Sequence, residues 1–300
     1  MAIRTAPLSE TFGTTLLATN QVNICELAQD EIRNLFKSSS LLLFRGFDVD
    51  TDNFKKFTEL FSSSFVSYAG GAYSREIING DQTLLSVTGG KQKWGVPLHG
   101  EMYYRKHKPS IIWFYCVTPA LNDGETTVCD GAQVYKELSC STQELLTKKR
   151  LKYIRTYPDS AWQKIYQTDD LNLVEKVCNE NDITLSVGPD QSITTEYVIS
   201  AIQESRYGKQ KVFINNILPV VSQESKGSNV SIVRFEDNSK IPDSILDEIK
   251  TVTDKLTHLV AWEKSDILMV DNTRLLHGRK SFSDNQRDIY VRLCDAAFPF

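Results

Sequence analysis

The sequence predicts one domain of mainly β structure, a β-sandwich or jelly roll with flanking helices, over residues 1–300. Three observations support this prediction. Several short apolar runs are bounded by polar or turn residues, as buried strands are. Only two segments show a clear helical stripe, and no repeat, low-complexity tract or linker divides the chain.

The first predicted strand covers residues 41–44, an apolar run that ends in a turn at Arg45 and Gly46. Four more strands are expected at residues 111–117, 212–214, 267–270 and 289–293. Each of these runs is apolar and short enough for a strand, so together they indicate a β-rich core.

The first predicted helix follows the strand at 41–44. Phe54, Phe57 and Phe61 recur at helical spacing and form one apolar face. Thr51 or Asp52 is expected to cap its start. The sequence therefore predicts a strand followed by a short amphipathic helix.

The second predicted helix lies near the end of the chain, just after Pro242. Its apolar stripe consists of Ile245, Ile249, Val252, Leu256 and Leu259. Asp243 or Ser244 is placed to cap its start. His258 falls inside this stripe and is expected to have a structural role.

Composition excludes several classes of protein. A net charge of −4, from 34 Lys and Arg against 38 Asp and Glu, argues against nucleic-acid binding. The longest apolar run, residues 111–117, is far shorter than the ~20 residues that span a membrane, and the first residues do not resemble a secretory signal. We therefore expect a cytoplasmic protein. The six cysteines include no C-x-x-C pair and are expected to be reduced thiols, most of them buried.

A candidate metal site centres on His99 and Glu101. In an extended segment, residues i and i+2 point to the same face, so the imidazole and the carboxylate converge. His277, at the end of another strand-like run, would complete two histidines and one carboxylate. This facial set leaves positions open for non-haem Fe(II) oxygen chemistry. By spacing alone, two unrelated histidines are the alternative.

Two arginines after His277 strengthen the metal hypothesis. Arg287 and Arg292 lie on a segment with strand alternation, and a guanidinium there can hold a carboxylate through two parallel hydrogen bonds. Arg287 shares a face with Ile289, whereas Arg292 shares the opposite face with Tyr290, so only one of them is expected to face the metal. A structural ion pair is the alternative for either.

Eight segments spread over most of the chain carry a resemblance to a known family. They are residues 42–47, 97–104, 112–117, 123–127, 162–170, 212–216, 271–279 and 287–291. With these motifs the sequence resembles the Fe(II)- and 2-oxoglutarate-dependent oxygenases of the taurine dioxygenase and clavaminate synthase superfamily, especially its syringomycin-biosynthesis-like branch. The resemblance implies a double-stranded β-helix, a jelly-roll (cupin-like) variant with the metal at the mouth of the barrel.

The resemblance also implies roles for individual residues. The iron ligands would be His99, Glu101 and His277; Thr126 would donate a hydrogen bond to 2-oxoglutarate; and Arg287, or as a second choice Arg292, would clamp its carboxylate. Fe(II), 2-oxoglutarate and O₂ would together oxidise an unactivated C–H bond, with succinate and CO₂ as coproducts. Because Glu101 occupies a ligand position, no site is freed for a halide, which favours hydroxylation, oxidative cyclisation or desaturation over halogenation.

The substrate is expected to be a small amino-acid-like molecule or specialised-metabolite precursor that bears a carboxylate or an amine. Polar residues that would suit it are Tyr103 or Tyr104, Asn215 or Asn216, Arg279 and Arg292. The alternative is an aminoacyl group tethered to a carrier protein, which the basic stretch 105–108 would dock. His107 in this stretch is otherwise expected to be solvated.

Two hypotheses from other classes use the same residues. A zinc-dependent hydrolase would use the same three ligands with a metal-bound water, but it would leave Thr126 and Arg287 unexplained. A catalytically silent protein would only bind a ligand or partner. A requirement for 2-oxoglutarate with release of succinate distinguishes an oxygenase from both.

Overall fold

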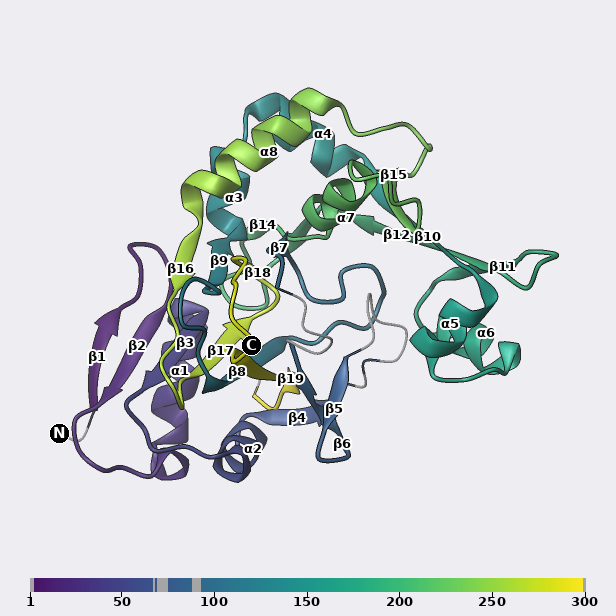
Figure 1. The fold of residues 1–300 in the computed structure, drawn as a ribbon. Helices are drawn as coiled ribbons and strands as arrows, with labels where there is room; N and C mark the ends of the chain where they lie inside the picture. Colours follow the sequence, from purple (N-terminus) through teal and green to yellow (C-terminus); the bar gives the residue numbers. More distant parts are fainter. Residues whose placement is uncertain (1–2, 67, 69–74, 88–92, 299–300) are drawn as a thin grey trace.

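The computed structural model describes residues 3–66, 68, 75–87 and 93–298, and it is mainly β with eight α-helices in these parts. Its centre consists of eight strands in two sheets (Figure 1). In chain order they are β6 (Asp81–Ser86), β7 (Val96–His99), β8 (Ile111–Thr118), β9 (Thr126–Asp130), β16 (His258–Val260), β17 (Ile267–Asp271), β18 (Leu275–Arg279) and β19 (Asp288–Ala296).

These eight strands switch between the two sheets at almost every step along the chain. The larger sheet contains the order β17-β8-β19-β6, and the smaller sheet has the order β16-β9-β18-β7. The larger sheet is extended by β1 (Ile3–Pro7), β2 (Thr14–Ala18) and β3 (Leu41–Arg45) at one edge and by β5 (Glu76–Ile78) at the other, while β4 (Ser62–Phe65) pairs with β19. Strands that are distant in sequence therefore become neighbours.

A third sheet and a hairpin lie beside this centre. The sheet has the order β11-β12-β10-β15, and β13 pairs with β14. Their bounds are β10 (Arg150–Tyr157), β11 (Thr184–Val187), β12 (Ile193–Ser200), β13 (Ile202–Glu204), β14 (Lys211–Phe213) and β15 (Ser231–Phe235). The helices are α1 (Gln29–Ser39), α2 (Thr51–Glu59), α3 (Gly131–Glu137), α4 (Cys140–Lys148), α5 (Asp159–Tyr166), α6 (Leu171–Glu180), α7 (Ile217–Glu224) and α8 (Asp243–Leu256).

Strand β8 is buried on both faces, which explains its unbroken apolar sequence. Phe114 lies in the larger core cluster, together with residues of the smaller sheet. Trp113 and Tyr115 point the other way into a second cluster, where Phe54 of α2 stacks on Tyr115 at 5.0 Å between ring centroids and Phe57 meets Trp113 edge-on at 5.8 Å. Helix α2 therefore covers the outer face of the larger sheet.

All five predicted strands are present, as β3, β8, β14, β17 and β19. The predicted number of helices was too low. The cap of α2 is Asp50, whose carboxylate accepts from the backbone N–H of Asn53 at 2.7 Å, rather than Thr51 or Asp52. The cap lies one residue earlier than expected because a helix boundary follows backbone geometry rather than residue type alone.

The late helix is shorter than its apolar stripe. Helix α8 ends at Leu256, and Leu259 belongs to β16 and is 44% exposed. His258 lies in the same strand, where it pairs with Val128 and packs edge-on against Phe12. Asp243 opens the helix after Pro242 without a side-chain capping bond.

The cysteines and the helices agree with two further expectations. All six cysteines are free thiols, and four of them are buried. In the parts of the chain that the structure describes, no helix combines the length and apolar character needed to cross a membrane.

Candidate metal and cosubstrate site

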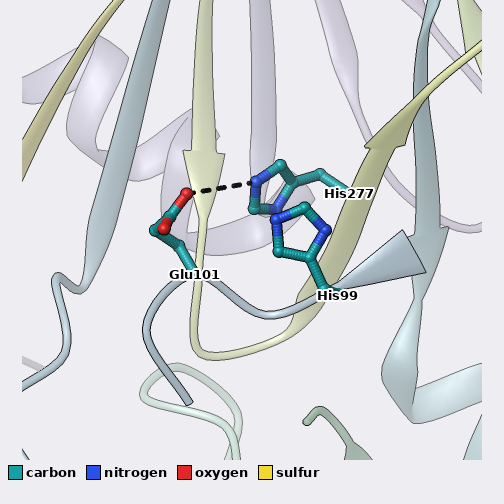
Figure 2. A group of neighbouring side chains, drawn as sticks. All are labelled: His99, Glu101 and His277. Carbon is teal, nitrogen blue, oxygen red and sulfur yellow. Dashed lines mark ion pairs between the residues drawn. The ribbon is translucent and has the colours of Figure 1, made fainter. Parts of the chain in front are cut away.

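The three predicted metal ligands come together where β7 and β18 pair. His277 of β18 lies opposite His99, the last residue of β7, and their ring centroids are 4.3 Å apart. Glu101 follows two residues later, with its Oε2 3.7 Å from His277 Nε2. One ligand atom from each of the three lies within 4.8 Å of the others. Figure 2 shows the three side chains turned toward one another.

A glycine lets the chain turn between the first two ligands. A Cβ on Gly100 would lie 2.4 Å from the Tyr103 ring and 2.8 Å from the Ile214 side chain, so no larger residue fits there without displacement. The Gly100 N–H donates to the Asn215 carbonyl at 3.0 Å. This close approach lets the backbone bring Glu101 back toward the histidines.

Asn272 holds the backbone of Glu101 on both sides. Its Oδ1 accepts from the Glu101 N–H at 2.8 Å, and its Nδ2 donates to the Glu101 carbonyl at 3.0 Å and to the Pro109 carbonyl at 2.7 Å. Asn272 is 1% exposed, so these bonds are shielded from water. The residue lies in the predicted motif at 271–279, but sequence reasoning assigned it no role.

The orientation of His99 suits metal binding. Its Nδ1 lies 2.9 Å from the Pro97 carbonyl, which can only accept, so Nδ1 carries the proton and Nε2 is left as a lone-pair donor. Burial, together with the nearby His277, lowers the pKa of His99 to about 4. The imidazole is therefore neutral near pH 7, as a metal ligand must be.

Arg75 keeps Glu101 ionised. Its Nη2 donates to Glu101 Oε2 at 2.9 Å, and its guanidinium lies 4.2 Å over the Tyr68 ring. Burial alone would raise the pKa of Glu101, but Arg75 and His277 hold it well below its ordinary value. The result is a buried carboxylate, 3% exposed, that carries its charge.

The donor set fits a non-haem iron. Two imidazole nitrogens and one carboxylate oxygen converge from one side, and such a facial arrangement leaves other coordination positions for further ligands. The site opens on a cavity of about 490 Å³, a volume typical of small-molecule sites. The cavity is lined by all three residues and by Phe114, whose ring is 5.7 Å from that of His277.

Thr126 and Arg287 both line this cavity. Thr126 Oγ1 accepts from Trp262 Nε1 at 3.0 Å, which leaves the hydroxyl proton available for a ligand. Arg287 is 4% exposed, and its Nε donates to the Gly124 carbonyl at 2.9 Å. Its Nη1 has no hydrogen-bond partner among the described residues. Burial, with Arg279 nearby, lowers the pKa of Arg287 to about 10, so an acidic ligand would stabilise its charge.

Arg292, the second choice for the clamp, points away from the cavity. As the alternation predicts, Arg292 of β19 does not share the cavity with Arg287, which directly precedes this strand. Its Nη1 donates to Thr58 Oγ1 at 2.6 Å, its Nη2 donates to Thr83 Oγ1 at 2.9 Å, and its guanidinium lies 3.7 Å from the centre of the Phe65 ring. Its polar partners are thus structural, and the expectation that Arg292 meets a cosubstrate or substrate is wrong.

Two of the four other predicted substrate residues line the cavity, Asn216 and Arg279. Tyr103 does not, because its hydroxyl donates to the Asn272 carbonyl at 2.9 Å, and its neighbour Tyr104 takes the place in the wall. Asn215 is also turned away: its Oδ1 accepts from the Ile217 N–H at 3.0 Å. The assignments of Tyr103 and Asn215 to the substrate are therefore corrected.

The basic stretch at 105–108 packs on the turn that follows α6. Arg105 Nε donates to Asn181 Oδ1 at 2.9 Å, and Lys106 forms a 2.9 Å ion pair with Asp182. His107 is exposed and does not line the cavity. The stretch therefore has partners within this chain.

The three candidate metal ligands share a cavity with the buried Arg287, an arrangement that suits a metal ion with an acidic ligand next to it. Comparison with known proteins then specifies the class: the family model described as taurine catabolism dioxygenase TauD, TfdA family matches residues 4–294, and the chain belongs to this family. The protein is an Fe(II)- and 2-oxoglutarate-dependent dioxygenase, with Fe(II) as cofactor, 2-oxoglutarate as cosubstrate and O₂ as oxidant. The zinc hydrolase and silent-binder hypotheses are thereby set aside.

Individual relatives agree with the family. The chain is 27% identical over 277 residues to a clavaminate synthase-like protein from Arabidopsis thaliana, covering 87% of this chain and 83% of that one. It is 25% identical over 289 residues to the dapdiamide synthesis protein DdaC from Enterobacter agglomerans, covering 89% and 86%. The structure of PvcB from Pseudomonas aeruginosa, an Fe, alpha-ketoglutarate dependent oxygenase from an isonitrile synthetic pathway, superposes with a TM-score of 0.62 at 15% identity, covering 98% and 92%. The fold is therefore shared with PvcB.

Proposed function

We propose that this protein oxidises an unactivated C–H bond of a small amino-acid-like or specialised-metabolite substrate, by hydroxylation, oxidative cyclisation or desaturation, with succinate and CO₂ as coproducts. The observation that carries the proposal is the triad of the half-buried His99 and the buried Glu101 and His277 at a cavity that also holds Arg287. A free small molecule is the proposed substrate, because the basic stretch suggested for carrier docking is engaged with residues 181–182.

Residues 1–300 would form one jelly-roll domain, a double-stranded β-helix. The order of the two sheets supports this, because the larger and smaller sheets exchange strands along the chain in the manner of a jelly roll. The triad lies beside the cavity where β7 ends opposite the middle of β18, and this position would be the mouth of the proposed barrel. Such a placement combines a rigid frame with access for small molecules.

Each residue has a defined task in this proposal. His99, Glu101 and His277 would hold Fe(II), and Arg75 fixes the charge and position of Glu101. Arg287 would pair with the distal carboxylate of 2-oxoglutarate.

Thr126 and its neighbours form another part of the proposed cosubstrate site. Thr126 would donate its hydroxyl proton to the same cosubstrate carboxylate, and Trp262, which donates to Thr126 Oγ1 and packs edge-on against Phe114, fixes the orientation of this hydroxyl. The bound iron supplies the redox chemistry that couples O₂ and 2-oxoglutarate to C–H oxidation. The protein contributes binding and orientation.

The test is anaerobic addition of Fe(II) and then 2-oxoglutarate to metal-free protein, with the visible charge-transfer band of the chelate as readout. The band should form in the parent protein and be lost in His99→Ala and His277→Ala. His107→Ala is the matched control, because this exposed histidine lies outside the cavity. An undiminished band in folded His99→Ala would refute the ligand assignment.

A further inference from the structure

The cavity wall contains more cationic than anionic side chains. Among the described residues, it contains one carboxylate, Glu101, and the cationic residues Arg75, Arg155, Lys226, Arg279 and Arg287. Most of these have an assignment. Arg75 pairs with Glu101, Arg279 donates to the carbonyls of residues 87 and 94, and Lys226 is exposed. Arg287 is proposed above to bind 2-oxoglutarate, so Arg155 is left to explain.

Arg155 occupies an inward position of an amphipathic strand. Leu151, Tyr153 and Tyr157 of β10 are buried, and Arg155 has the same parity and is only 9% exposed. An arginine at such a position is uncommon, because a buried guanidinium loses its hydration. Sequence reasoning passed over it, although the alternation along 150–157 contains the signal.

Among the described residues, no carboxylate pairs with this buried charge. Arg155 forms no ion pair within the part of the chain that the structure describes, and its Nε has no hydrogen-bond partner there. Its guanidinium carbon lies 3.5 Å from the centre of the Tyr104 ring, a cation–π contact. Burial raises the pKa of Tyr104, so this phenol does not supply a negative charge near pH 7.

Only one of the two spaces beside Arg155 can admit a counter-ion. The smaller space, of about 10 Å³, holds no more than about one water. It is enclosed mainly by aromatic side chains, those of Tyr104, Tyr153, Tyr157, Tyr166 and Tyr197. The larger space is the 490 Å³ cavity that contains the metal triad. An anion that satisfies Arg155 must therefore enter from the catalytic side.

This part of the wall adjoins the metal site through direct contacts. Tyr104, under the Arg155 guanidinium, is three residues after Glu101 and lines the same cavity. Arg75 bridges Glu101 and the Tyr68 hydroxyl, at 2.9 and 3.3 Å. A molecule anchored at Arg155 would thus lie beside the candidate iron ligands, whereas Arg287 is held at a different part of the wall by its bond to the Gly124 carbonyl.

We propose that Arg155 is the anchor for a carboxylate of the primary substrate, and that the substrate therefore belongs to the carboxylic acids rather than to the amines. This inference rests on the oxygenase function proposed above. The planar guanidinium of Arg155 can donate two parallel hydrogen bonds to a carboxylate. An ammonium group would instead be repelled by the cationic side chains that line the cavity. The rest of the molecule would extend from Arg155 toward the triad.

The test compares acids with their amides. Binding of a panel of N-acetyl-L-amino acids, from aliphatic to aromatic, and of the corresponding N-acetyl-L-amino acid amides is measured by calorimetry on the full chain carrying Mn(II) and N-oxalylglycine. The acids should bind more tightly than their amides. Arg155→Met should weaken acid binding by about 10- to 100-fold and leave amide binding unchanged. Arg155→Lys, which keeps the charge, should recover part of the loss.

Arg150→Met is the matched control. Arg150 lies on the same strand, but it is exposed and pairs with Glu236, so its replacement makes the same charge change outside the cavity. It should not affect acid binding. Circular dichroism of each variant shows whether the fold is retained. If Arg155→Met does not fold, Arg155→Lys takes its place, and its acid binding should then be weaker than that of the parent protein.

Equal binding of acids and amides, no acid binding across the panel, or an acid preference that survives in Arg155→Met overturns the proposal. Failure of the proposed oxygenase function would give a different result from failure of the Arg155 proposal. In that case the parent protein itself would not bind N-oxalylglycine in an Mn(II)-dependent manner. Repeating the panel in metal-free Arg287→Met without N-oxalylglycine removes both the metal and that second carboxylate site, so a loss of acid binding on adding Arg155→Met reports on Arg155.

Discussion

Replacing Arg287 by methionine should weaken 2-oxoglutarate binding without harming the fold. The guanidinium is buried, and its contacts among the described residues are one bond to the Gly124 carbonyl and the face of the Phe282 ring at 5.4 Å. Methionine keeps the apolar stem and removes a charge that has no carboxylate partner in the part of the chain that the structure describes. The stability of the ligand-free protein should therefore stay the same or rise slightly.

The expected loss in affinity follows from the same contacts. Truncating one side of a buried, hydrogen-bonded charge pair costs about 2–5 kcal/mol. The lower part of this range applies, because chelation by the metal persists and water in the open cavity can solvate part of the orphaned carboxylate. A loss of about 2–3 kcal/mol corresponds to a Kd that is roughly 30- to 150-fold higher.

Arg292→Met is the informative counterpart. Arg292 donates to Thr58, Thr83 and the Lys55 carbonyl and stacks on Phe65, so its loss should destabilise the fold by about 2–4 kcal/mol and leave the Kd unchanged. The assays are titration of the anaerobic charge-transfer band for affinity and urea unfolding for stability. An Arg292→Met protein that is stable but binds 2-oxoglutarate weakly, beside a normal Arg287→Met, would refute the assignment.

Three further outcomes are expected. Gly100→Ala should lower the free energy of unfolding by about 1–3 kcal/mol, because the new methyl group would meet the Tyr103 ring, and an unchanged urea midpoint would contradict this. Arg75→Met should reduce metal affinity about tenfold in a competition with a chelator, since Glu101 loses the partner that fixes it; equal affinity would remove Arg75 from the site. Burial raises the pKa of Asp271 to about 6, so the folded state holds this proton where the unfolded chain has lost it. Stability should therefore fall by about 2–3 kcal/mol as pH rises from 4 to 6, and Asp271→Asn should abolish that part of the urea-unfolding profile.

The strands could be predicted because the apolar character of their side chains directly reflects their burial. The run at 111–117 is apolar throughout because both faces of β8 are buried. One face contributes Phe114 to the larger core cluster, and the other packs under α2. Helices such as α5 and α6 were missed because each is short and packs only against a small separate cluster around Trp162. In such segments tertiary contacts decide the structure and the periodic signal is weak.

The candidate metal ligands could be predicted from spacing together with the family resemblance, but the residues around them could not. Alternation places His99 and Glu101 on one face, yet β7 ends at His99 and Met102 adopts a left-handed φ of 63°. Beyond that point the period of two no longer holds, which is why Tyr104 rather than Tyr103 lines the cavity. The role of Arg75 could not be predicted for another reason. Arg75 lies outside the helices and strands, so no periodic sequence pattern indicates its contact with Glu101.

The position of β19 has a consequence for biosynthesis. The last strand that the structure describes lies inside the larger sheet, between β8 and β6, and His277, the third candidate ligand, is supplied by β18 just before it. A ribosome-bound chain that lacks these segments has an open gap between two strands and an incomplete set of candidate metal donors. Because such long-range pairing forms late and slowly, we expect the three donors to come together only after residues 275–296 have been synthesised and have paired. Metal uptake would then report that both central sheets have formed.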